Sequence, residues 1–435
     1  MGNSTMYDVI GIGIGPYNLG LAALSYERSD LKTIFFDQNG QFAWHPGMLI
    51  PGTDLQVPFL ADLVTFANPT SKFTFTNYLH QKNRLYKFFF FQKLEMPRAE
   101  YAAYLKWVAD QLPTCNFQSE VVDVIDQKDH YEVVVNHWGK QTTESYFTKH
   151  VVMGTGSEPN IPIELEGAEI ENVHHSSQYL YHKDRTIKAK NITVVGSGQS
   201  ASEIFYDLLK LQEHFSYQLS WYTRSPGFLQ LDQSKLGQEV FTPDYVDYFY
   251  HLEFKERIES LDYLGQLRKG IDGDTLHHIH EWLYHHSVEN KPLPITIQPL
   301  TEIHKASYTG DQLKVEGEQW QKKESITFNT DILILATGYV PNIPDWFYNR
   351  FQDKIEWEDE KRFKVRKNFQ LAFKDKNRSH HFYTLTNLEH SHGTGATNLG
   401  LAVDRNIQII NDIAGRTVYG NQRGTIFSQF SPNNK

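Results

Sequence analysis

Glycines alternate near the start of the chain, in the stretch YDVIGIGIGPYNLGLAAL at residues 7–24. An apolar run precedes them and a helix-like run follows, which predicts a strand, a tight turn and a helix. Such a turn can bind a dinucleotide, because glycines leave room for a pyrophosphate and the helix N-terminus offers unpaired N–H groups. Gly13 and Gly15 occupy the first two glycine positions, Asn18 occupies the third, and Asp37 is placed to hold the ribose hydroxyls. A tight turn of another α/β fold is the alternative.

A second glycine turn, VVGSGQSASE at residues 194–203, repeats the pattern with Gly196, Gly198 and Ala201. The strand predicted after this turn ends in Arg224 instead of an acid. An arginine there can pair with the 2′-phosphate of NADPH, which an acid would repel. The pattern therefore predicts NADPH rather than NADH, and a surface arginine without this role is the alternative.

Two nucleotide-binding turns in one chain indicate two cofactors, of which FAD and its reductant NADPH are the simplest pair. The segments HVVMGTGSEPNIP and DILILATGYVPNIP both read as a strand followed by TG–x–x–P, and they fit two places where the chain passes between domains. We expect an α/β fold with two Rossmann-like dinucleotide-binding domains, the NADPH domain inserted into the FAD domain. The expected parts are residues 1–165 (FAD domain), 166–330 (NADPH domain with a substrate-lining helical segment), 331–420 (FAD domain, second part) and 421–435 (disordered tail).

Hydrophobic periodicity predicts further elements between these turns. Residues 32–37 predict a strand, residues 100–112 an amphipathic helix and residues 121–137 a β-hairpin. The aromatic stretch YKFFFFQ, at residues 86–92, is expected to form a buried strand or an interface rather than a wedge in a membrane.

The composition excludes several classes of function. A formal net charge of −10 argues against nucleic-acid binding, which depends on a cationic surface. No apolar stretch reaches the roughly 18 residues that a membrane span needs, and no secretory signal is recognisable, so a cytoplasmic protein is expected. The single cysteine, Cys115, excludes an internal disulfide and the dithiol of a disulfide reductase. The histidines of HHIHEWLYHH scatter around a predicted helix, so no metal site is expected.

Longer motifs are more specific than either glycine turn. WHPGM (residues 44–48) and LQVPF (residues 55–59) stand out, together with GIGPYNLGLA, PRAEY, GSGQSASE and DILILATGY. Together these motifs resemble the class B flavin-dependent N-hydroxylating monooxygenases, the lysine N6- and ornithine N5-monooxygenases of siderophore biosynthesis. The resemblance extends from Tyr7 to about Ile413, and the stretch at residues 225–250 is closer to the lysine or diamine branch than to the ornithine branch.

The resemblance implies that NADPH reduces FAD, that the reduced flavin and O₂ form a C4a-hydroperoxyflavin, and that a small primary amine takes up one oxygen atom. It also implies a homo-oligomer, a tetramer by analogy with relatives. The implied FAD-binding residues are Gly13, Gly15, Pro16, Asn18, Asp37, Trp44, His45 and Gln56. The implied NADPH-binding residues are Ser197, Gly198, Gln199, Ser200 and Arg224, followed at the domain junction by Thr337, Gly338 and Tyr339 and on a last cofactor-binding turn by Asn398 and Leu399. The implied substrate-binding positions are Gln56, Ala61 and Gln238.

The substrate pocket departs from the family pattern. Ornithine hydroxylases have a lysine that pairs with the substrate carboxylate at the position of Ala61. An asparagine of the same pocket is replaced by Gln238, and the acid of an HG–x–x–D motif is replaced by Ala396. The missing anchor favours an amine without a carboxylate, such as cadaverine, putrescine or histamine. L-lysine or L-ornithine, with its carboxylate held by another residue, is the alternative.

The expected reaction also constrains the pocket. A primary alkyl amine has a pKa near that of Lys, about 10.4, and only its neutral form is a nucleophile. A desolvating pocket lowers that pKa, so we expect an apolar amine channel without a carboxylate at the reacting nitrogen, and no general base can be assigned. Two other classes stay open: a flavin amine oxidase, which needs no NADPH, and an NADPH-sensing protein without catalytic activity.

Overall fold

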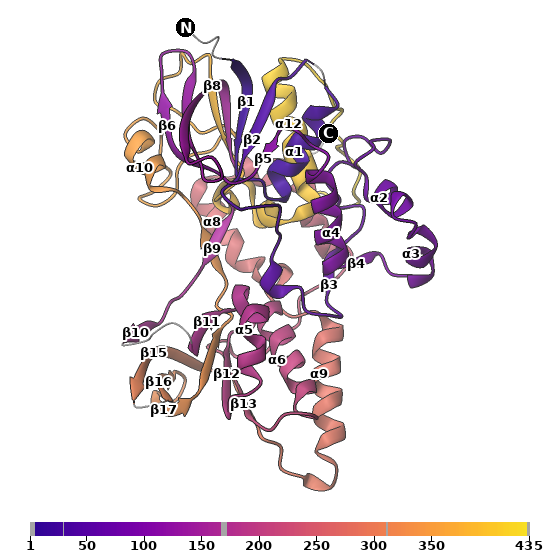
Figure 1. Cartoon of the computed structure of the whole chain (residues 1–435), viewed down its shortest axis with the longest axis vertical. Helices are drawn as coiled ribbons and strands as arrows, with labels where there is room; N and C mark the ends of the chain where they lie inside the picture. The colour runs from indigo at the N-terminus through magenta and orange to yellow at the C-terminus, as the bar shows by residue number, and fades with distance from the viewer. Residues whose placement is uncertain (1–4, 29, 167–171, 310–311, 433–435) are drawn as a thin grey trace.

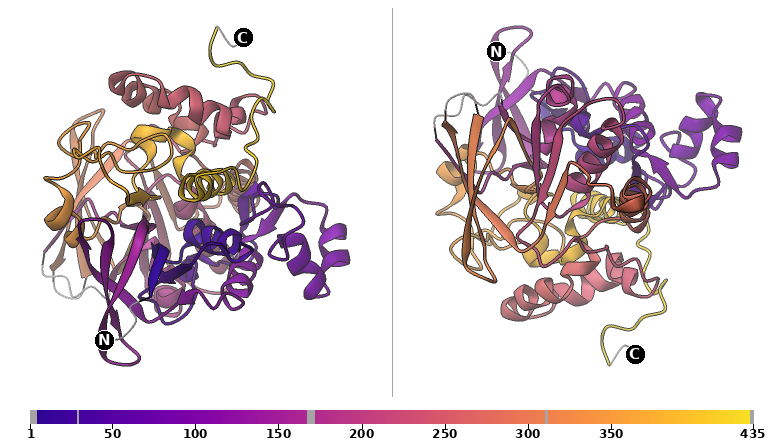
Figure 2. Two further views of the ribbon diagram at one scale, coloured as in Figure 1. Left: turned by 90° about the horizontal axis from the view of Figure 1, so that it is seen from above. Right: turned by 90° about the horizontal axis from the view of Figure 1, so that it is seen from below.

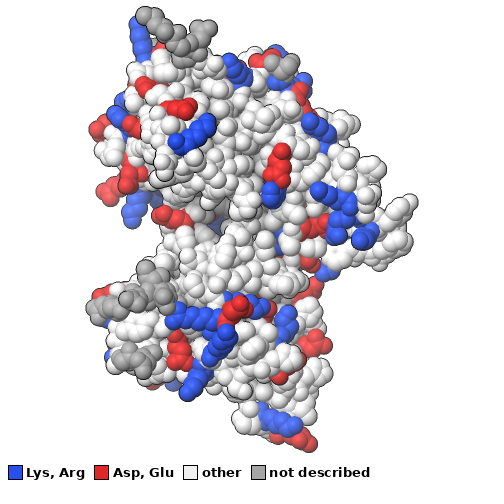
Figure 3. Space-filling model, viewed as in Figure 1, with Lys and Arg blue, Asp and Glu red and all other residues white. Residues whose placement is uncertain are grey.

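Figure 1 shows two α/β bodies, one above the other, joined by the strands β9 (Ser157–Pro159) and β19 (Tyr339–Pro341). The first body contains the N-terminal and C-terminal parts of the chain, and the second body contains the middle part. The surface is hollowed between the two bodies (Figure 3). This computed structural model describes residues 5–28, 30–166, 172–309 and 312–432.

The first body is built on a seven-stranded sheet. Its strands are β1 (Met6–Ile12), β2 (Thr33–Phe36), β5 (Cys115–Asn116), β6 (Ser119–Asp126), β7 (Tyr131–His137), β8 (Thr142–Met153) and β20 (His381–Thr384). Their order is β5-β2-β1-β8-β7-β6, with β20 also paired to β8. β1 runs parallel to β2 and β8, so that Ile10 lies opposite Ile34 and Val151. Apolar strands of this kind are typical of a parallel sheet that is covered on both faces.

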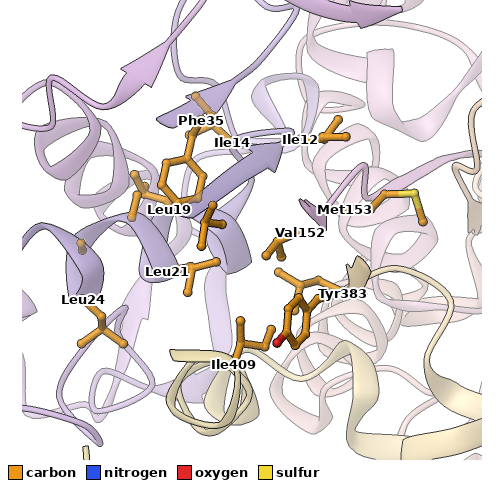
Figure 4. Packing of buried hydrophobic residues seen from close by; sticks show 14 of the residues in the cluster. Ile12, Ile14, Leu19, Leu21, Leu24, Phe35, Val152, Met153, Tyr383 and Ile409 are labelled. Atoms are coloured by element: carbon orange, nitrogen blue, oxygen red, sulfur yellow. The ribbon is translucent and has the colours of Figure 1, made fainter. Parts of the chain in front are cut away.

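Helices and short connecting elements surround this sheet. They are α1 (Pro16–Tyr26), η1 (Pro46–Met48), β3 (Asp54–Pro58), α2 (Phe75–Gln81), α3 (Leu85–Phe91), β4 (Glu95–Pro97), α4 (Arg98–Ala109), α10 (Asp345–Phe351), α11 (Glu389–His392), η7 (Thr394–Thr397), η8 (Leu399–Leu401) and α12 (Ala402–Ala414). In the core, Leu21 of α1, Ile409 of α12 and Tyr383 of β20 point toward one another (Figure 4).

The second body is built on a parallel five-stranded sheet in the order β11-β18-β12-β13-β14. Its strands are β11 (Val173–His175), β12 (Asn191–Val195), β13 (Gln218–Tyr222), β14 (Ile295–Gln298) and β18 (Ile332–Leu335). A second sheet contains β10 (Glu164–Glu166), β15 (Thr301–Thr309), β16 (Gln312–Gln319) and β17 (Glu324–Thr330). The helical elements of this body are η3 (Ser176–Gln178), α5 (Tyr179–Thr186), α6 (Gln199–Leu211), α9 (Gly273–His286) and η6 (Val288–Asn290). The same middle part of the chain contains η4 (Gly237–Phe241), α7 (Pro243–Tyr250), α8 (Phe254–Tyr263) and η5 (Gly265–Leu267), of which η4, α7 and α8 pack against α11 and η7 of the first body.

The two connections between the bodies lie side by side. β9 and β19 pair antiparallel, with Tyr339 opposite Pro159. Each strand is the x–x–P part of a TG–x–x–P segment, where the sequence predicts the crossings. The repeat predicts that the first body resumes at residue 331, but β18 pairs with β11 and β12 in the second sheet. The chain therefore returns only at β19, because the last strand of the inserted sheet precedes the crossing.

Most of the predicted elements are confirmed: the strand at residues 32–37 is β2, the helix at 100–112 begins and ends slightly earlier as α4, and residues 121–137 form the β6–β7 hairpin. The aromatic stretch at residues 86–92 differs, because it forms the exposed helix α3 instead of a buried strand. Phe88 packs against Phe59 and Phe75 at the edge of the core, whereas the α2–α3 region as a whole stands out from the first body (Figure 2).

The C-terminal segment, whose polar composition predicts a disordered tail, packs on the surface as far as it is described. The Nη1 of Arg423 lies 2.9 Å from the Oδ1 of Asp404, and the Phe430 ring packs against Tyr245 and Tyr248 of α7. Residues 433–435 lie outside the described residues. Short-range sequence patterns could not predict these contacts, because the partners are distant in the chain.

Candidate functional site

The first glycine turn has the geometry that a bound pyrophosphate requires. Gly13 has a φ of +82°, and a Cβ atom there would lie 2.5 Å from the carbonyl oxygen of Gly154, so only glycine fits. Gly15 begins α1 from an extended conformation, and no described atom lies within 4 Å of the position a Cβ would take. Pro16 follows at the first helical position, where it gives up no hydrogen bond. The turn thus leaves the N-terminus of α1 open for a phosphate group.

Asp37 lies at this turn, as the sequence predicts. Its Oδ2 accepts a hydrogen bond from the backbone N–H of Ile14 at 2.7 Å, and its Oδ1 accepts one from the N–H of Asn39 at 2.8 Å. The carboxylate is therefore fixed at the end of β2, next to the open end of α1. This is the place where an acid can bind a ribose.

Asn18 has a different place from the one that the resemblance implies. Its side chain is fully buried, and its Nδ2 donates to the carbonyl oxygens of Ile12 at 3.1 Å and Gly13 at 2.8 Å. The amide therefore holds the turn from beneath instead of facing its open side. Gly154 provides the necessary room, since a Cβ there would lie 2.7 Å from the Asn18 Nδ2. This pairing of a large residue on the helix with a glycine on the facing strand was not predicted.

The second glycine turn repeats this construction in the second body. Gly196 has a φ of +140°, and a Cβ there would lie 2.2 Å from the carbonyl oxygen of Ala336. Gly198 begins α6, and within the described residues no atom lies within 4 Å of its Cβ position. The Oγ of Ser197 lies 2.9 Å from the Oγ of Ser225, and Ser200 is half-buried in the first turn of α6. The N-terminus of α6 is therefore open to a second dinucleotide.

Arg224 follows the strand β13 and is largely exposed. Its Nη1 lies 3.5 Å from the Oε1 of Glu302, and 76% of the Arg224 side chain is accessible. A pair this exposed contributes little to stability. The guanidinium is therefore free to exchange this carboxylate for a phosphate.

We expect Arg224→Ala to raise the KM for NADPH about tenfold, since one charge-assisted hydrogen bond contributes about 1.5–3 kcal/mol. The KM for NADH, which has no 2′-phosphate, should stay unchanged. Glu302→Gln removes the competing carboxylate and should lower the KM for NADPH. Initial rates of NADPH and NADH oxidation test this, and an unchanged NADPH to NADH preference in Arg224→Ala would leave Arg224 as a surface residue.

A cleft of about 670 Å³ lies between the two bodies. It brings together three glutamines that the sequence placed in the site: Gln56 on β3, Gln199 on α6 and Gln238 on η4. The Nε2 of Gln238 donates to the carbonyl oxygen of Asp232 at 2.7 Å. The Nε2 of Gln199 donates to Glu203 at 2.9 Å. Residues from both cofactor-binding segments and from the substrate segment therefore share one cleft.

One buried ion pair joins the walls of this cleft. Arg98 of α4 forms two hydrogen bonds to the carboxylate of Glu203 on α6, both 2.7 Å long, and also donates to the carbonyl oxygen of Met48 at 3.2 Å. The two side chains are only 13% and 4% exposed. Bidentate arginine–carboxylate pairs fix orientation as well as distance. Because Glu203 also holds the amide of Gln199, the pair connects the first body directly to a predicted NADPH contact.

Sequence reasoning did not assign this pair to the site. Both residues lie in motifs that carry the family resemblance, PRAEY and GSGQSASE. The signal was a charged residue on the otherwise apolar face of a predicted helix, which requires a partner when it is buried.

The WHPGM motif lies at a close contact between the two bodies. A Cβ at Gly47 would lie 1.9 Å from the carbonyl oxygen of Ser177, so glycine allows the two backbones to touch. His45 has a φ of +44°, and its ring packs edge-on against Trp44 and Tyr339, with centroids 4.9 and 5.9 Å apart. Burial, together with the charge of the nearby arginine, lowers the pKa of His45, which favours a neutral ring.

The domain-junction residues hold the second crossing in place. The backbone N–H of Asn160 donates to the carbonyl oxygen of Gly338 at 2.9 Å, and the hydroxyl of Thr337 donates to the carbonyl oxygen of Asn160. The Nε2 of His175 lies 2.9 Å from the same oxygen of Gly338, and its ring packs edge-on against Tyr339. These predicted residues therefore lie at the joint between the bodies.

Ala61 does not itself line the cleft, but its backbone N–H donates at 2.9 Å to the carbonyl oxygen of Pro58, which does. It is 6% exposed, and its Cβ is 3.7 Å from the Cβ position of Gly400. Gly400 belongs to the turn of Asn398 and Leu399, where the Oδ1 of Asn398 accepts the N–H of Gly400 at 2.7 Å. Ala61 is therefore adjacent to the predicted last cofactor-binding turn, and its buried methyl group occupies the position where the resemblance implies a lysine in ornithine hydroxylases.

The histidines of α9 pack against aromatic neighbours: the His286 ring stacks on Trp282 at 3.7 Å and the His278 ring on Tyr206 at 5.9 Å. Within the described ranges, no three His, Cys, Asp or Glu side chains form a group that could hold a metal ion. In the same part of the chain, no helix is long and apolar enough to cross a membrane.

Two open helix N-termini, one in each body and each preceded by a glycine turn, define a protein with two dinucleotide sites, as a flavoprotein that uses FAD and NADPH requires. Residues 5–341 match the family model of L-lysine 6-monooxygenase/L-ornithine 5-monooxygenase. The chain belongs to this family of flavin-dependent N-monooxygenases. The family decides against the amine oxidase and the non-catalytic sensor that the sequence left open.

Individual relatives agree with this assignment over nearly the whole chain. A putrescine N-hydroxylase of Acinetobacter baumannii is 35% identical over 434 residues, which are 99% of this chain and 95% of the relative. The FAD-bound cadaverine monooxygenase of the desferrioxamine pathway of Erwinia amylovora is 34% identical, with a TM-score of 0.91 over 99% of this chain and 100% of that one. An ornithine N-hydroxylase of Kutzneria, with reduced FAD, NADP⁺ and L-ornithine, has a TM-score of 0.87 at 26% identity over 94% and 99% of the two chains.

Proposed function

We propose that this enzyme hydroxylates one terminal amine of a small diamine, of the cadaverine or putrescine type, for the biosynthesis of a hydroxamate siderophore. The observation that carries this proposal is Ala61. A buried alanine cannot pair with a substrate carboxylate, whereas the corresponding lysine of ornithine hydroxylases can. The similarity to putrescine and cadaverine enzymes over almost the full length supports the same substrate class.

The charges of the cleft support a cationic substrate. Six carboxylates and three lysines line it, and one of these lysines, Lys93, pairs with Asp54 at 2.9 Å, so the lining carries an excess of acids. A diamine brings two ammonium groups in solution, and carboxylates attract such a cation but repel the carboxylate of an amino acid. The reaction requires the neutral form of the amine. The glutamines of the cleft can hold this form by hydrogen bonds without stabilising the protonated form.

The cofactors have separate tasks in this proposal. Gly15 and Asp37 would hold FAD, and Gly198 would hold NADPH. The bound pair would supply the reducing equivalents that activate O₂. The protein binds and orients the amine, and it limits access of water to the cofactors. Since NADPH is a cytoplasmic reductant, we place the reaction in the cytoplasm.

A panel of amines tests the substrate class. NADPH-dependent formation of hydroxylamine should be highest with cadaverine or putrescine and lower with L-lysine, L-ornithine and histamine. Preferred turnover of L-lysine or L-ornithine would contradict the proposal and would mean that another residue holds the carboxylate. Preferred turnover of histamine would support the monooxygenase reaction but contradict the diamine as substrate.

The variant Ala61→Lys should lower kcat/KM for the diamine about 100-fold, because a like charge near the distal ammonium costs several kcal/mol. Ala61→Met is the matched control, since it adds similar length without the charge. A comparable loss in both variants would assign the effect to bulk, and would remove charge from the explanation. The measurement is hydroxylamine yield at several substrate concentrations.

We also propose that the enzyme is a homo-oligomer and that α3 lies in a contact between copies. Three aromatic side chains of α3, Tyr86, Phe89 and Phe90, are 81%, 69% and 72% exposed. Contiguous apolar patches of this kind mark interaction sites. The double variant Phe89→Ser/Phe90→Ser should therefore lower the mass measured by light scattering, whereas Tyr263→Ser, which removes an exposed ring from α8, should not. A monomeric wild-type protein would contradict this.

A further inference from the structure

The C-terminal segment, residues 421–432, is fastened to the surface by three carboxylates. Arg423 pairs with Asp404 at 2.9 Å, and the backbone N–H of Gly424 donates to Asp244 at 2.7 Å. Farther along, the N–H groups of Phe427 and Ser428 donate to the two oxygens of one carboxylate, Glu239, at 3.1 and 2.8 Å. We call this segment the strap.

The strap connects elements that are distant in the sequence. Asp404 belongs to the first turn of α12, in the first body, whereas Asp244 belongs to α7 and Glu239 to η4. Figure 2 shows the C-terminal segment leaving α12 and passing beside the pink helices that contain α7. The strap therefore ties the middle part of the chain to the end of the first body.

An aromatic contact closes the far end of the strap. The Phe430 ring packs edge-on against Tyr245 at 4.8 Å and lies 6.0 Å from Tyr248. Tyr245 is buried in a small cluster with Phe249, so the ring is anchored on a packed surface. By contrast, the side chain of Phe427 is 91% exposed, although its backbone N–H is bound.

The residue next to Glu239 is Gln238, which lines the cleft. The η4 turn that holds both is only five residues long, and its glutamine side chain bonds to the backbone of Asp232, in the loop before it. Glu239 is the residue of this turn to which the strap is hydrogen-bonded. The bonds from Ser428 and Phe427 lower the pKa of the Glu239 carboxyl, so the carboxylate is the form that the strap binds.

We propose that the strap positions η4, and with it Gln238, at the substrate side of the cleft. Arg423 and Phe430 are then positioning residues for amine binding. This inference deepens the proposed function and rests on it for the identity of the substrate. None of the strap contacts given above involves a residue of either glycine turn, so loss of its Phe430 end should affect amine binding and leave FAD binding and its reduction by NADPH intact.

The test compares the full chain with a chain ending at Gly420 and with Phe430→Ala. Both variants should raise the KM for the amine at least about tenfold, which corresponds to about 1.4 kcal/mol. FAD content and the rate of flavin reduction by NADPH without amine should stay within about twofold of wild type. Phe427→Ala removes the same kind of ring from an exposed place and should change nothing. Arg423→Lys should keep most of the amine affinity that Arg423→Ala loses.

Hydrogen–deuterium exchange gives a readout that needs no substrate. Residues 237–241 should exchange faster in Phe430→Ala and in the shortened chain, and at the wild-type rate in Phe427→Ala. Unchanged exchange there, or an equal loss of FAD, flavin reduction and amine affinity, would overturn the proposal. If the wild-type enzyme hydroxylates no diamine but exchange is faster in the variants, the proposed function is refuted. The inference that the strap positions η4 would still hold.

Discussion

Gly15→Ala is expected to give a folded protein that binds FAD about 100-fold more weakly, which corresponds to about 2.7 kcal/mol. Gly15 has a φ of −79°, which alanine adopts without strain, and no described atom lies near its Cβ position. The added methyl group would therefore disturb nothing in the protein itself. It would occupy the space through which a pyrophosphate approaches the N-terminus of α1. Absorbance of the purified protein at flavin wavelengths and titration of the apoprotein with FAD measure the effect.

Gly198→Ala is the matched control in the second body. Its Cβ position is equally open, so this variant should also fold, retain FAD and lose affinity for NADPH by a similar factor. The melting temperatures of both apoproteins should equal that of the wild type. The assignment of the two turns to the two cofactors is wrong if Gly15→Ala retains FAD fully. It is also wrong if Gly15→Ala loses affinity for NADPH and Gly198→Ala loses affinity for FAD.

Arg98→Ala is expected to slow the reduction of FAD by NADPH about 100-fold, since a misplacement of about 1 Å can cost that much. The variant leaves the carboxylate of Glu203 buried without its partner, which costs about 3–5 kcal/mol of stability. Glu203 also holds the amide of Gln199, so the loss extends to a predicted NADPH contact. Stopped-flow measurement of flavin bleaching and the melting temperature report the two effects separately.

Lys106→Ala is the control for this variant, because Lys106 pairs with Asp110 on the same helix but in an exposed place. That variant should change stability by less than about 1 kcal/mol and leave flavin reduction at the wild-type rate. Arg98→Met/Glu203→Leu should recover stability, since apolar residues often replace a buried pair without loss. It should not recover the rate, because nothing then orients the two bodies. Full activity of that double variant would show that the pair contributes only stability.

The two nucleotide-binding turns could be predicted because their constraints are local. Gly13 and Gly196 need positive φ values, and Gly15 and Gly198 need an empty Cβ position, so each turn imposes its glycines within a few residues. Asp37 could be placed because it ends the second predicted strand, about 20 residues after the glycine turn. The role of Asn18 could not, since its burial depends on Gly154, a residue of another strand.

Features that depend on distant contacts escaped prediction. The Arg98–Glu203 pair joins positions 105 residues apart, and the strap joins Phe427 to Glu239 across 188. The stretch that forms α3 was predicted to be a buried strand or an interface, whereas its seven residues form a helix on which Tyr86, Phe89 and Phe90 are exposed. The predicted boundary at residue 331 also differs from the structure. It depends on the pairing of β18 with β12, which joins residues far apart in the sequence.

The adjacent crossings β9 and β19 make the middle of this protein a cassette. The chain enters and leaves it at one place, with Tyr339 opposite Pro159, so the ends of the cassette coincide. Coincident ends allow a host domain to tolerate an insertion, provided that the remaining contacts between the two parts, such as the Arg98–Glu203 pair, are kept. A coenzyme preference can therefore be exchanged as one unit between homologues, by recombination at two neighbouring points, without rebuilding the sheet that holds the flavin.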